Sequence, residues 1–192
     1  VGDRAISDSE RQPHTSAVVK YRALRRDEIP AIWAIERRER IERIFVAGAS
    51  GLELVDAPFD VPGWEAGRPA AQTPVFEASF DAGAWFYGAF DGGRIAGIAV
   101  LEPMFFGLDQ DTLQLSFLHV TAELRGMGVG RQLFESARTE AKSRGARRMY
   151  VSATPTERTV EFYLARGCEL LAEPDPSLFA LEPEDIHLIC AV

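Results

Sequence analysis

Short runs rich in apolar residues, bounded by glycine, proline and aspartate, recur along the chain and predict strands. Ala84–Phe90 and Arg94–Leu101 flank Asp91-Gly92-Gly93, a sequence typical of a hairpin turn. The run Thr112–Val120 predicts a further strand. Three shorter runs predict a first, a late and a final strand, at Ala17–Leu24, Met149–Ser152 and Ile186–Val192.

Apolar residues at helical spacing predict two helices in the second half of the chain. The segment Arg131–Arg144 carries its apolar residues on one side and is followed by Gly145, a typical helix stop. The segment Glu157–Arg166 predicts another helix, closed by Gly167. Together with the strands, these helices give a strand–loop–helix–strand unit, whose two strands are expected to be parallel.

The pattern between residues 27 and 73 predicts a helix followed by a loop. A helix opens at Asp27 or Glu28, with proline in its first turn, where a missing N–H costs nothing. Apolar residues near helical spacing continue to Phe45, and acid–base pairs four residues apart in the charged run Glu36–Arg43 predict an exposed helical face, with a break or a second helix. The segment Gly48–Thr73 is rich in glycine and proline and predicts a long functional loop.

Length and composition indicate one α/β domain. The chain has 192 residues and a mass of 21.2 kDa, which suits a single core. Residues 1–16 lack periodicity and predict a flexible leader, so the domain is expected to span residues 17–192. No apolar run approaches the roughly 18–20 residues of a membrane span, and we expect a cytoplasmic protein with no membrane partner.

Charge and metal-ligating residues exclude two further classes. The formal net charge of −8 argues against a nucleic-acid partner. Cys168 and Cys190 are too few for a disulfide scaffold and are expected to pack as small apolar residues. The three histidines are scattered, so no metal cofactor is expected. A homodimer is compatible with this composition.

Positive charge is concentrated in one segment. Between Arg125 and Arg148 lie seven basic and two acidic residues, a local net charge of +5. Glycines at positions 126, 128 and 130 precede the predicted helix from Arg131, and amides at a helix N-terminus are a ready site for phosphate. The segment does not fit the dinucleotide-binding fingerprint, which requires glycine at position 131, where this chain has arginine. It does not fit a P-loop either, because the chain contains no Gly-Lys-Ser/Thr tripeptide.

This segment resembles the signature of the GCN5-related N-acetyltransferases, the GNAT superfamily. That signature is Arg or Gln, two residues, Gly, one residue, then Gly or Ala, and Arg125-Gly126-Met127-Gly128-Val129-Gly130 matches it in full. A strand ends five residues earlier, and Thr159–Cys168 resembles the second family motif, a helix bearing Phe-Tyr. The resemblance covers Trp85–Cys168 and implies an α/β fold with a mixed, strongly twisted central sheet flanked by helices.

The resemblance also implies a cofactor and a set of site residues. Acetyl-CoA would lie where the strands Leu113–Val120 and Met149–Ser152 splay apart, with main-chain groups near Leu118 on its pantetheine arm and loop amides on its pyrophosphate. Tyr163 would act as general acid toward the departing thiolate. The implied cofactor-binding residues are Leu118, His119, Val120, Arg125, Gly126, Met127, Gly128, Val129, Gly130, Arg131, Thr156 and Tyr163.

The chain departs from the family pattern at the general base. Gln114 stands where some members carry glutamate, and an amide cannot accept the proton. We predict Glu102, at the end of the strand Arg94–Leu101, as the second catalytic residue beside Tyr163. His119 is a weaker candidate, because it is expected to point to the opposite face from Gln114 and Ser116, and His187 is expected to be a hydrogen-bonded structural residue.

The implied activity is acetyl-CoA-dependent N-acetyl transfer to a primary amine, by direct attack in a ternary complex. The segment 36–65 is expected to form the acceptor wall, and its seven acidic residues against four arginines, with Trp64 and Phe59, favour a small cationic amine such as an antibiotic or a metabolite. Two alternatives stay open: an acyl-CoA-binding regulatory module without efficient catalysis, and a protein-lysine acetyltransferase.

Overall fold

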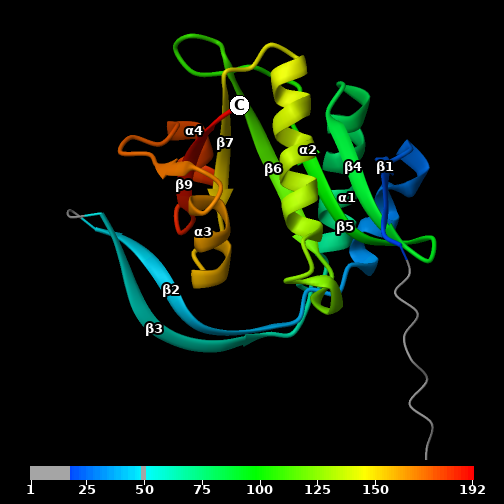
Figure 1. Cartoon of the computed structure of the whole chain (residues 1–192), viewed down its shortest axis with the longest axis horizontal. Coiled ribbons are helices and arrows are strands. Elements are labelled where there is room, and N and C mark those ends of the chain that lie inside the picture. The colour runs from blue at the N-terminus through cyan, green and yellow to red at the C-terminus, as the bar shows by residue number, and fades with distance from the viewer. Residues whose placement is uncertain (1–17, 49–50) are drawn as a thin grey trace, which may run out of the picture.

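A computed structural model describes residues 18–48 and 51–192, and the predicted leader lies outside these ranges. At its centre is a seven-stranded mixed sheet with the strand order β1-β4-β5-β6-β7-β9-β8 (Figure 1). The strands are β1 (Lys20–Ala23), β4 (Trp85–Asp91), β5 (Arg94–Leu101), β6 (Thr112–Val120), β7 (Arg148–Ala153), β8 (Cys168–Leu170) and β9 (Ile186–Ala191). A separate antiparallel pair, β2 (Glu39–Gly48) and β3 (Gly51–Val61), forms a long curved arm.

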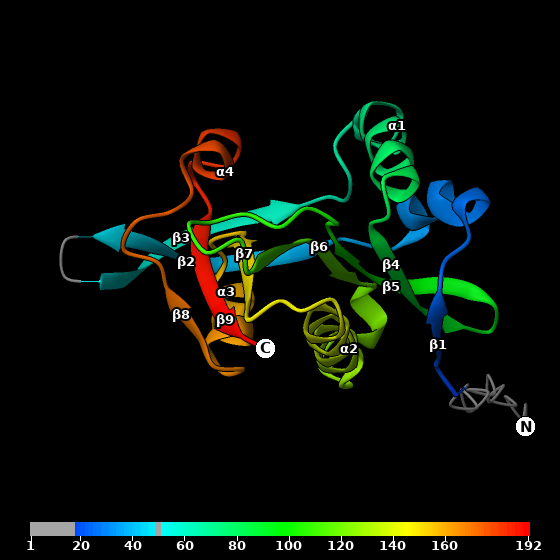
Figure 2. The ribbon, with the colours of Figure 1, turned by 90° about the horizontal axis from the view of Figure 1, so that it is seen from above.

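The helices cover both faces of the sheet (Figure 2). They are the 3-10 helices η1 (Arg26–Ala34) and η2 (Ala122–Leu124) and the α-helices α1 (Arg68–Asp81), α2 (Val129–Ser143), α3 (Glu157–Leu164) and α4 (Pro176–Leu181). Side chains from α2 and α3 build one core cluster with the sheet, whereas η1 and α1 build the other. The sequence-based prediction of an α/β fold is therefore confirmed.

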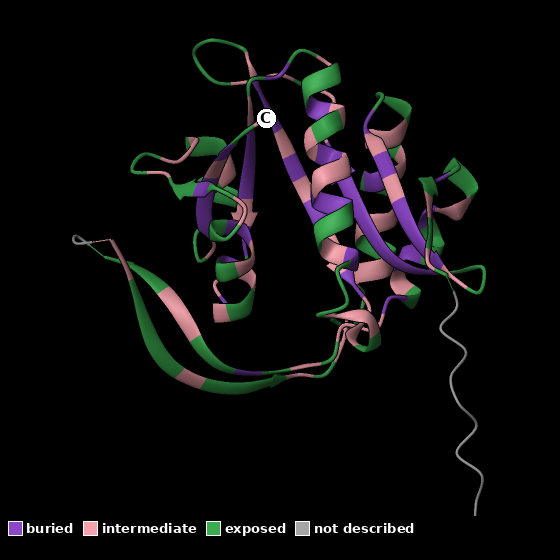
Figure 3. Cartoon of the chain, in the orientation of Figure 1, coloured by how far each residue is buried: buried purple, intermediate pink, exposed green. Residues whose placement is uncertain are grey.

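Most elements of the second half are confirmed. The hairpin β4–β5, strands β6, β7 and β9, and helices α2 and α3 lie at the predicted places. Helix α2 buries its apolar side, including Leu133, Phe134 and Ala137, against the sheet (Figure 3). Strands β6 and β7 are parallel, as a strand–helix–strand crossover requires.

The prediction of a helix followed by a loop is wrong for Glu39–Gly48 and Gly51–Val61, because these residues are the two antiparallel strands of the arm. Arg40 pairs with Glu42 on the same strand and with Asp60 on β3, and Arg43 pairs with Glu157 of α3. Acid–base pairs four apart suit a helix surface, but the same charges also suit cross-strand pairing, and backbone hydrogen bonds to a partner strand decided the outcome.

The remainder of the predicted loop also folds into an element. Helix α1 begins at Arg68 after Gly67, which adopts φ 86° as the residue before the helix. Pro69 lies in the first turn, where its missing N–H costs nothing. Trp33 donates a hydrogen bond of 2.8 Å to Thr73 and so ties η1 to α1.

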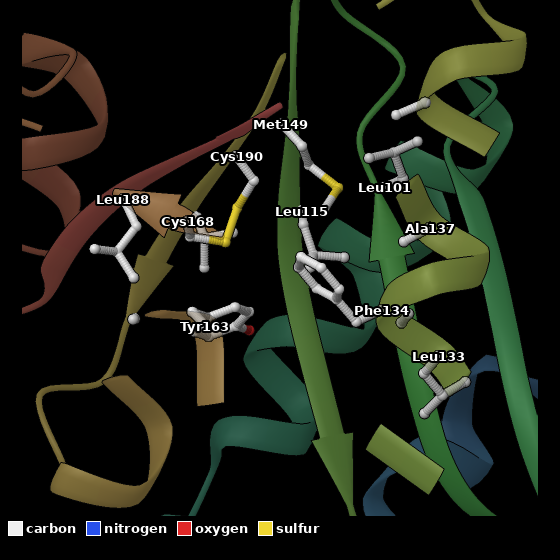
Figure 4. Close-up of a cluster of buried hydrophobic side chains, with 14 of the residues drawn as sticks. Leu101, Leu115, Leu133, Phe134, Ala137, Met149, Tyr163, Cys168, Leu188 and Cys190 are labelled. Carbon is white, nitrogen blue, oxygen red and sulfur yellow. A yellow bond between two sulfur atoms is a disulfide. The ribbon is translucent and has the colours of Figure 1, made fainter. Parts of the chain in front are cut away.

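The expectation that the two cysteines pack as free apolar residues is wrong, because Cys168 and Cys190 form a disulfide (Figure 4). The short strand β8 was not predicted from the sequence. Its antiparallel register with β9 places Cys168 directly opposite Cys190, with a Cα–Cα distance of 4.2 Å. Pairing of neighbouring strands thus brings together two residues 22 positions apart.

Reduction of this disulfide is expected to lower the free energy of unfolding by about 3 kcal/mol, because the cross-link removes loop-closure entropy from the unfolded chain. The chain contains two cysteines, so a reductant changes nothing else covalently. Urea unfolding with and without reductant measures the effect, and thiol titration in denaturant should detect no free thiol before reduction. Two free thiols in the unreduced protein would contradict the pairing.

Candidate active site

Strands β6 and β7 pair over a short length and then diverge (Figure 1). Their parallel register covers three residue pairs, which end at Gln114 opposite Tyr150. Beyond Gln114, β6 stays paired with β5 up to Val120, whereas β7 stays paired with β9 up to Ala153. The expected splay between these strands is therefore present.

The divergence leaves main-chain groups of β6 without a strand partner. The amide of Thr121 donates to the carbonyl of Ala96 at 2.7 Å, so residues 121, 119 and 117 direct their main-chain groups toward β5. Leu118 and Val120 alternate with them and face the side of β7. The Val120 carbonyl accepts a hydrogen bond of 3.1 Å from Nε of Arg125, and the Leu118 N–H and C=O have no hydrogen-bond partner among the described residues.

A second set of free amides lies at the start of α2. Gly126 and Gly128 adopt φ values of 77° and 86°, a conformation that favours glycine. The first helical bond of α2 joins the amide of Gln132 to the carbonyl of Gly128 at 3.0 Å. In the described part of the chain, the amides of residues 128–131 consequently have no acceptor. Such amides, with the positive end of the helix dipole, are suited to a phosphate group.

The third glycine and the motif arginine have structural roles. A Cβ at Gly130 would lie 3.3 Å from the Phe162 ring, so glycine lets α2 pack closely on α3. The Arg125 guanidinium donates to the carbonyls of Val120 and Arg38 and forms an ion pair with Glu39 at 3.1 Å. The Arg125 side chain therefore holds the glycine loop against the base of the arm.

Tyr163 lies on α3 in the core cluster beneath the divergence. Its ring contacts those of Phe134 and Phe162, at centroid distances of 5.8 Å and 5.0 Å, and it lies beside the disulfide in Figure 4. Burial raises the pKa of the Tyr163 hydroxyl above its usual value, with a further increase from Asp185 and a decrease from Arg166. Within the described ranges this hydroxyl has no hydrogen-bond partner.

Two other predicted site residues make specific contacts within the protein. Thr156 is the N-cap of α3 and accepts a hydrogen bond of 3.3 Å from the Thr159 amide. The Glu102 carboxylate accepts hydrogen bonds from the hydroxyls of Ser79 on α1 and Ser116 on β6. These contacts place Glu102 on the α1 face of the sheet.

The expected opposition of His119 and Ser116 is wrong. The register between β5 and β6 shifts at this point, so Leu115 lies opposite Leu101 and Phe117 opposite Val100. The irregularity interrupts the alternation of side chains. Ser116 reaches Glu102 and Phe117 packs on α1, so both lie on the face that His119 shares.

His119 lies in an aromatic and positively charged environment that sequence reasoning missed. Its ring contacts Trp64 at 4.9 Å and Phe117 at 4.4 Å. The pKa of His119 is lowered to about 3, mainly by desolvation and in the same direction by the positive charges of Arg37, Arg68 and Arg125. The imidazole is therefore neutral at physiological pH.

Asp185 is a second residue that the sequence did not single out. It directly precedes β9, beside the end of β7, since Ile186 lies opposite Ala153. Burial raises the pKa of Asp185 to about 6, Glu182 adds to the increase, and Arg37 and Arg68 oppose it. His187, two residues later, forms a hydrogen bond of 2.6 Å between its Nδ1 and the Tyr150 hydroxyl, as expected for a hydrogen-bonded structural histidine.

Three further observations bear on the predicted partners. No described helix is long and apolar enough to cross a membrane. The described residues contain no group of three or more His, Cys, Asp or Glu side chains that could hold a metal ion. Two surface hollows of about 370 and 350 Å³ lie away from the strand divergence, one between Trp85 and α2 and the other at the base of the arm.

Comparison with solved structures shows the same fold. A nourseothricin acetyltransferase is 20% identical, with a TM-score of 0.68 over 90% of this chain and 98% of that one. A putative streptothricin acetyltransferase from Bacillus anthracis, solved with acetyl coenzyme A, is 14% identical, with a TM-score of 0.68 over 91% and 98%. PaiA N-acetyltransferase from Thermoplasma acidophilum, solved with coenzyme A, is 12% identical, with a TM-score of 0.59 over 91% and 99%.

Comparison of sequences gives two results. No curated protein matches this chain. The profile of the acetyltransferase (GNAT) family matches residues 52–168, which is more than half of the chain and includes the glycine loop and Tyr163. The resemblance seen in the sequence motifs is thereby confirmed, and the chain belongs to the GNAT family of acetyltransferases.

Proposed function

We propose that this protein transfers an acetyl group from acetyl-CoA to a primary amine of a small molecule, by direct attack in a ternary complex. The observation that carries the proposal is the row of unpaired main-chain groups along the divergence of β6 and β7. These groups are the free N–H and C=O of Leu118 and the amides at the start of α2. A pantetheine arm needs main-chain partners and a pyrophosphate needs converging amides.

The residues around the divergence fit acetyl-CoA. The Leu118 carbonyl would accept a hydrogen bond from the pantetheine arm, and the amides of residues 128–131 would bind the pyrophosphate. Arg131 is exposed beside these amides and forms no ion pair within the described ranges, so its charge is available to phosphate. Two of the solved structures with this fold contain acetyl coenzyme A or coenzyme A, which supports the assignment.

Acetyl-CoA supplies an activated acyl group as a thioester. The Leu118 amide is the donor positioned to stabilise negative charge on the acyl oxygen. The Tyr163 hydroxyl donates a proton to the leaving thiolate, and its raised pKa keeps it in the protonated form that a general acid needs. Both cysteines are joined in the disulfide, so neither provides a thiol for a covalent acyl-enzyme, and direct attack by the amine is favoured.

Two carboxylates are candidates for the group that accepts the amine proton. Glu102 already accepts hydrogen bonds from two serine hydroxyls and holds β6 to α1. Asp185 has no side-chain hydrogen bond or ion pair among the described residues, and it interacts electrostatically with Tyr163. Its raised pKa of about 6 makes it a better base near neutral pH than an ordinary aspartate. We therefore favour Asp185 over Glu102.

The glycine loop is tested by calorimetric titration with acetyl-CoA, with NADH as the control ligand. We expect micromolar binding of acetyl-CoA alone, and its loss in Gly128→Leu, because a side chain there would occupy the approach to the free amides. Gly145→Leu is the matched control, since Gly145 has a similar φ of 96° and lies beyond the opposite end of α2. Unchanged affinity in Gly128→Leu would refute the phosphate site. Binding without turnover for any amine would favour the regulatory module.

Removal of the Tyr163 hydroxyl tests the general acid. Tyr163→Phe should lower kcat by about 100-fold. Acetyl-CoA affinity and thermal stability should change little, because the hydroxyl has no partner within the described structure. Tyr150→Phe is the control, since Tyr150 bonds His187 and its loss should reduce stability but leave kcat unchanged. Equal turnover of Tyr163→Phe and wild type would remove Tyr163 from the mechanism.

The pH dependence of kcat/KM distinguishes Asp185 from Glu102 as the group that accepts the amine proton. We expect kcat/KM to rise as Asp185 ionises around pH 6 and then to level. Asp185→Asn should abolish the rise of kcat/KM around pH 6 and lower its value at higher pH about 100-fold. Glu102→Gln should keep the rise. The opposite pattern would assign the base to Glu102.

Ionisation of Asp185 is also expected to lower the stability of the folded protein. The raised pKa means that the folded state holds this proton more tightly than the unfolded state, so ionisation of Asp185 lowers stability as pH rises from about 4 through about 6. Asp185→Asn should therefore gain melting temperature over wild type across this window. A constant difference between the two proteins would contradict the raised pKa.

A further inference from the structure

Two arginines, Arg37 and Arg68, lie beside the candidate site. Arg37 follows η1, and Arg68 is the first residue of α1. Neither forms an ion pair within the described ranges, although the neighbouring Arg38, Arg40 and Arg43 each do. The Arg37 guanidinium instead lies over the Trp64 ring, 5.2 Å from its centroid.

Arg37 is partly buried and lies close enough to Arg68 for the two positive charges to repel each other. Desolvation lowers the pKa of Arg37, and repulsion by Arg68 and Arg125 lowers it further. Glu65 and Glu39 act in the opposite direction, but Glu39 is shared with Arg125 and Arg158. Asp185 interacts with both arginines without forming an ion pair with either.

His119 connects this positive region to the acyl-transfer site. Arg37 and Arg68 both lower its pKa, so they lie near its ring, and His119 adjoins Leu118 in β6. The aromatic groups around His119 belong to the core cluster on the η1 and α1 face, opposite the face that α2 covers. Figure 2 shows α1 and α2 on opposite faces of the sheet, so a group held beside His119 would lie across the sheet from α2.

The beginning of α1 adds positive potential at the same place. This helix carries no acidic residue in its first turn, and its N-cap Gly67 provides no capping side chain, although the amides of Arg68 and Ala71 donate to the carbonyls of Glu65 and Gly67. The partial positive charge of the helix N-terminus therefore adds to that of Arg68. An ammonium group would be repelled from this region, whereas an anion would be attracted to it.

We propose that Arg37 and Arg68 bind a carboxylate of the acceptor, so that the acceptor is an amino-acid-type amine. This inference rests on the proposed acetyl transfer and names its substrate class. A guanidinium matches a carboxylate with two parallel hydrogen bonds, and a partly desolvated arginine with no partner gains most from one. Asp185, which interacts with the same arginines, lies where it can accept the proton of the attacking amine.

Part of the acidic wall expected for a cationic amine is paired with arginines of the same segment. Glu36 pairs with Arg38, and Glu42 and Asp60 pair with Arg40. Phe59, which was expected to line this wall, is exposed on β3. The arm Glu39–Val61 keeps five acidic residues against two arginines, whereas Arg37 and Arg68 lie outside it, next to His119.

Matched acceptors that differ only by the carboxylate test the proposal. We would compare phenylalanine with 2-phenylethylamine, histidine with histamine, and lysine with cadaverine. In at least one pair, wild type should prefer the amino acid by about 30-fold or more in kcat/KM. Arg37→Gln and Arg68→Gln should each lower kcat/KM for that amino acid by about 30-fold and leave its decarboxylated partner within about twofold. Arg40→Gln, on the arm, is the control and should change neither.

A binding measurement keeps the test independent of turnover. Calorimetry would compare N-acetylphenylalanine with N-acetyl-2-phenylethylamine in the presence of coenzyme A, and the carboxylate should bind more tightly in wild type only. Intact acetyl-CoA binding with no carboxylate preference, or with a preference that persists in the double variant, would overturn this inference alone. Absence of acetyl-CoA binding by wild type would instead overturn the proposed function.

Discussion

The limited pairing of β6 with β7 is the constraint on which the candidate site depends. A parallel ladder that continued past Gln114 would consume the main-chain groups of Leu118, and no ligand could bind this edge of β6. The register shift opposite Val100 also turns Ser116 and Phe117 toward α1, so one face receives Glu102 and His119. The short pairing with β7 leaves one edge of β6 available, and the register shift places Ser116, Phe117 and His119 on the face where we propose that the acceptor binds.

A sheet joined by three residue pairs at its centre needs other links between its halves, and the β2–β3 arm provides them. On the β6 side, Glu39 pairs with Arg125 next to the glycine loop. On the β7 side, the Phe45 amide donates to the Pro155 carbonyl at 2.7 Å and Arg43 pairs with Glu157 of α3. The arm therefore joins the start of α2 to the start of α3, and its base places Arg37 beside His119.

Sequence reasoning succeeded where an element carries its own signal. The turn Asp91-Gly92-Gly93 and the stops Gly145 and Gly167 mark boundaries that the structure reproduces. It failed for Glu39–Val61, because the charges suit a helix surface and a strand pair equally well. At the site, the motif residues of the glycine loop and Tyr163 were identifiable, whereas Arg37, Arg68 and Asp185 were not. Their proximity arises from tertiary packing between distant segments, as does the disulfide.

The position of β9 determines the order in which the halves of the sheet can be completed. This strand lies between β7 and β8, although it follows both in the chain. During synthesis, β1, β4, β5 and β6 can assemble with α2 as soon as they leave the ribosome, since each pairs with a strand already made or made next. Helix α3, with Tyr163, must wait for β9 before its side of the sheet is closed and the disulfide can form. The amides at the start of α2 can therefore be in place in the nascent chain before Tyr163 is fully packed.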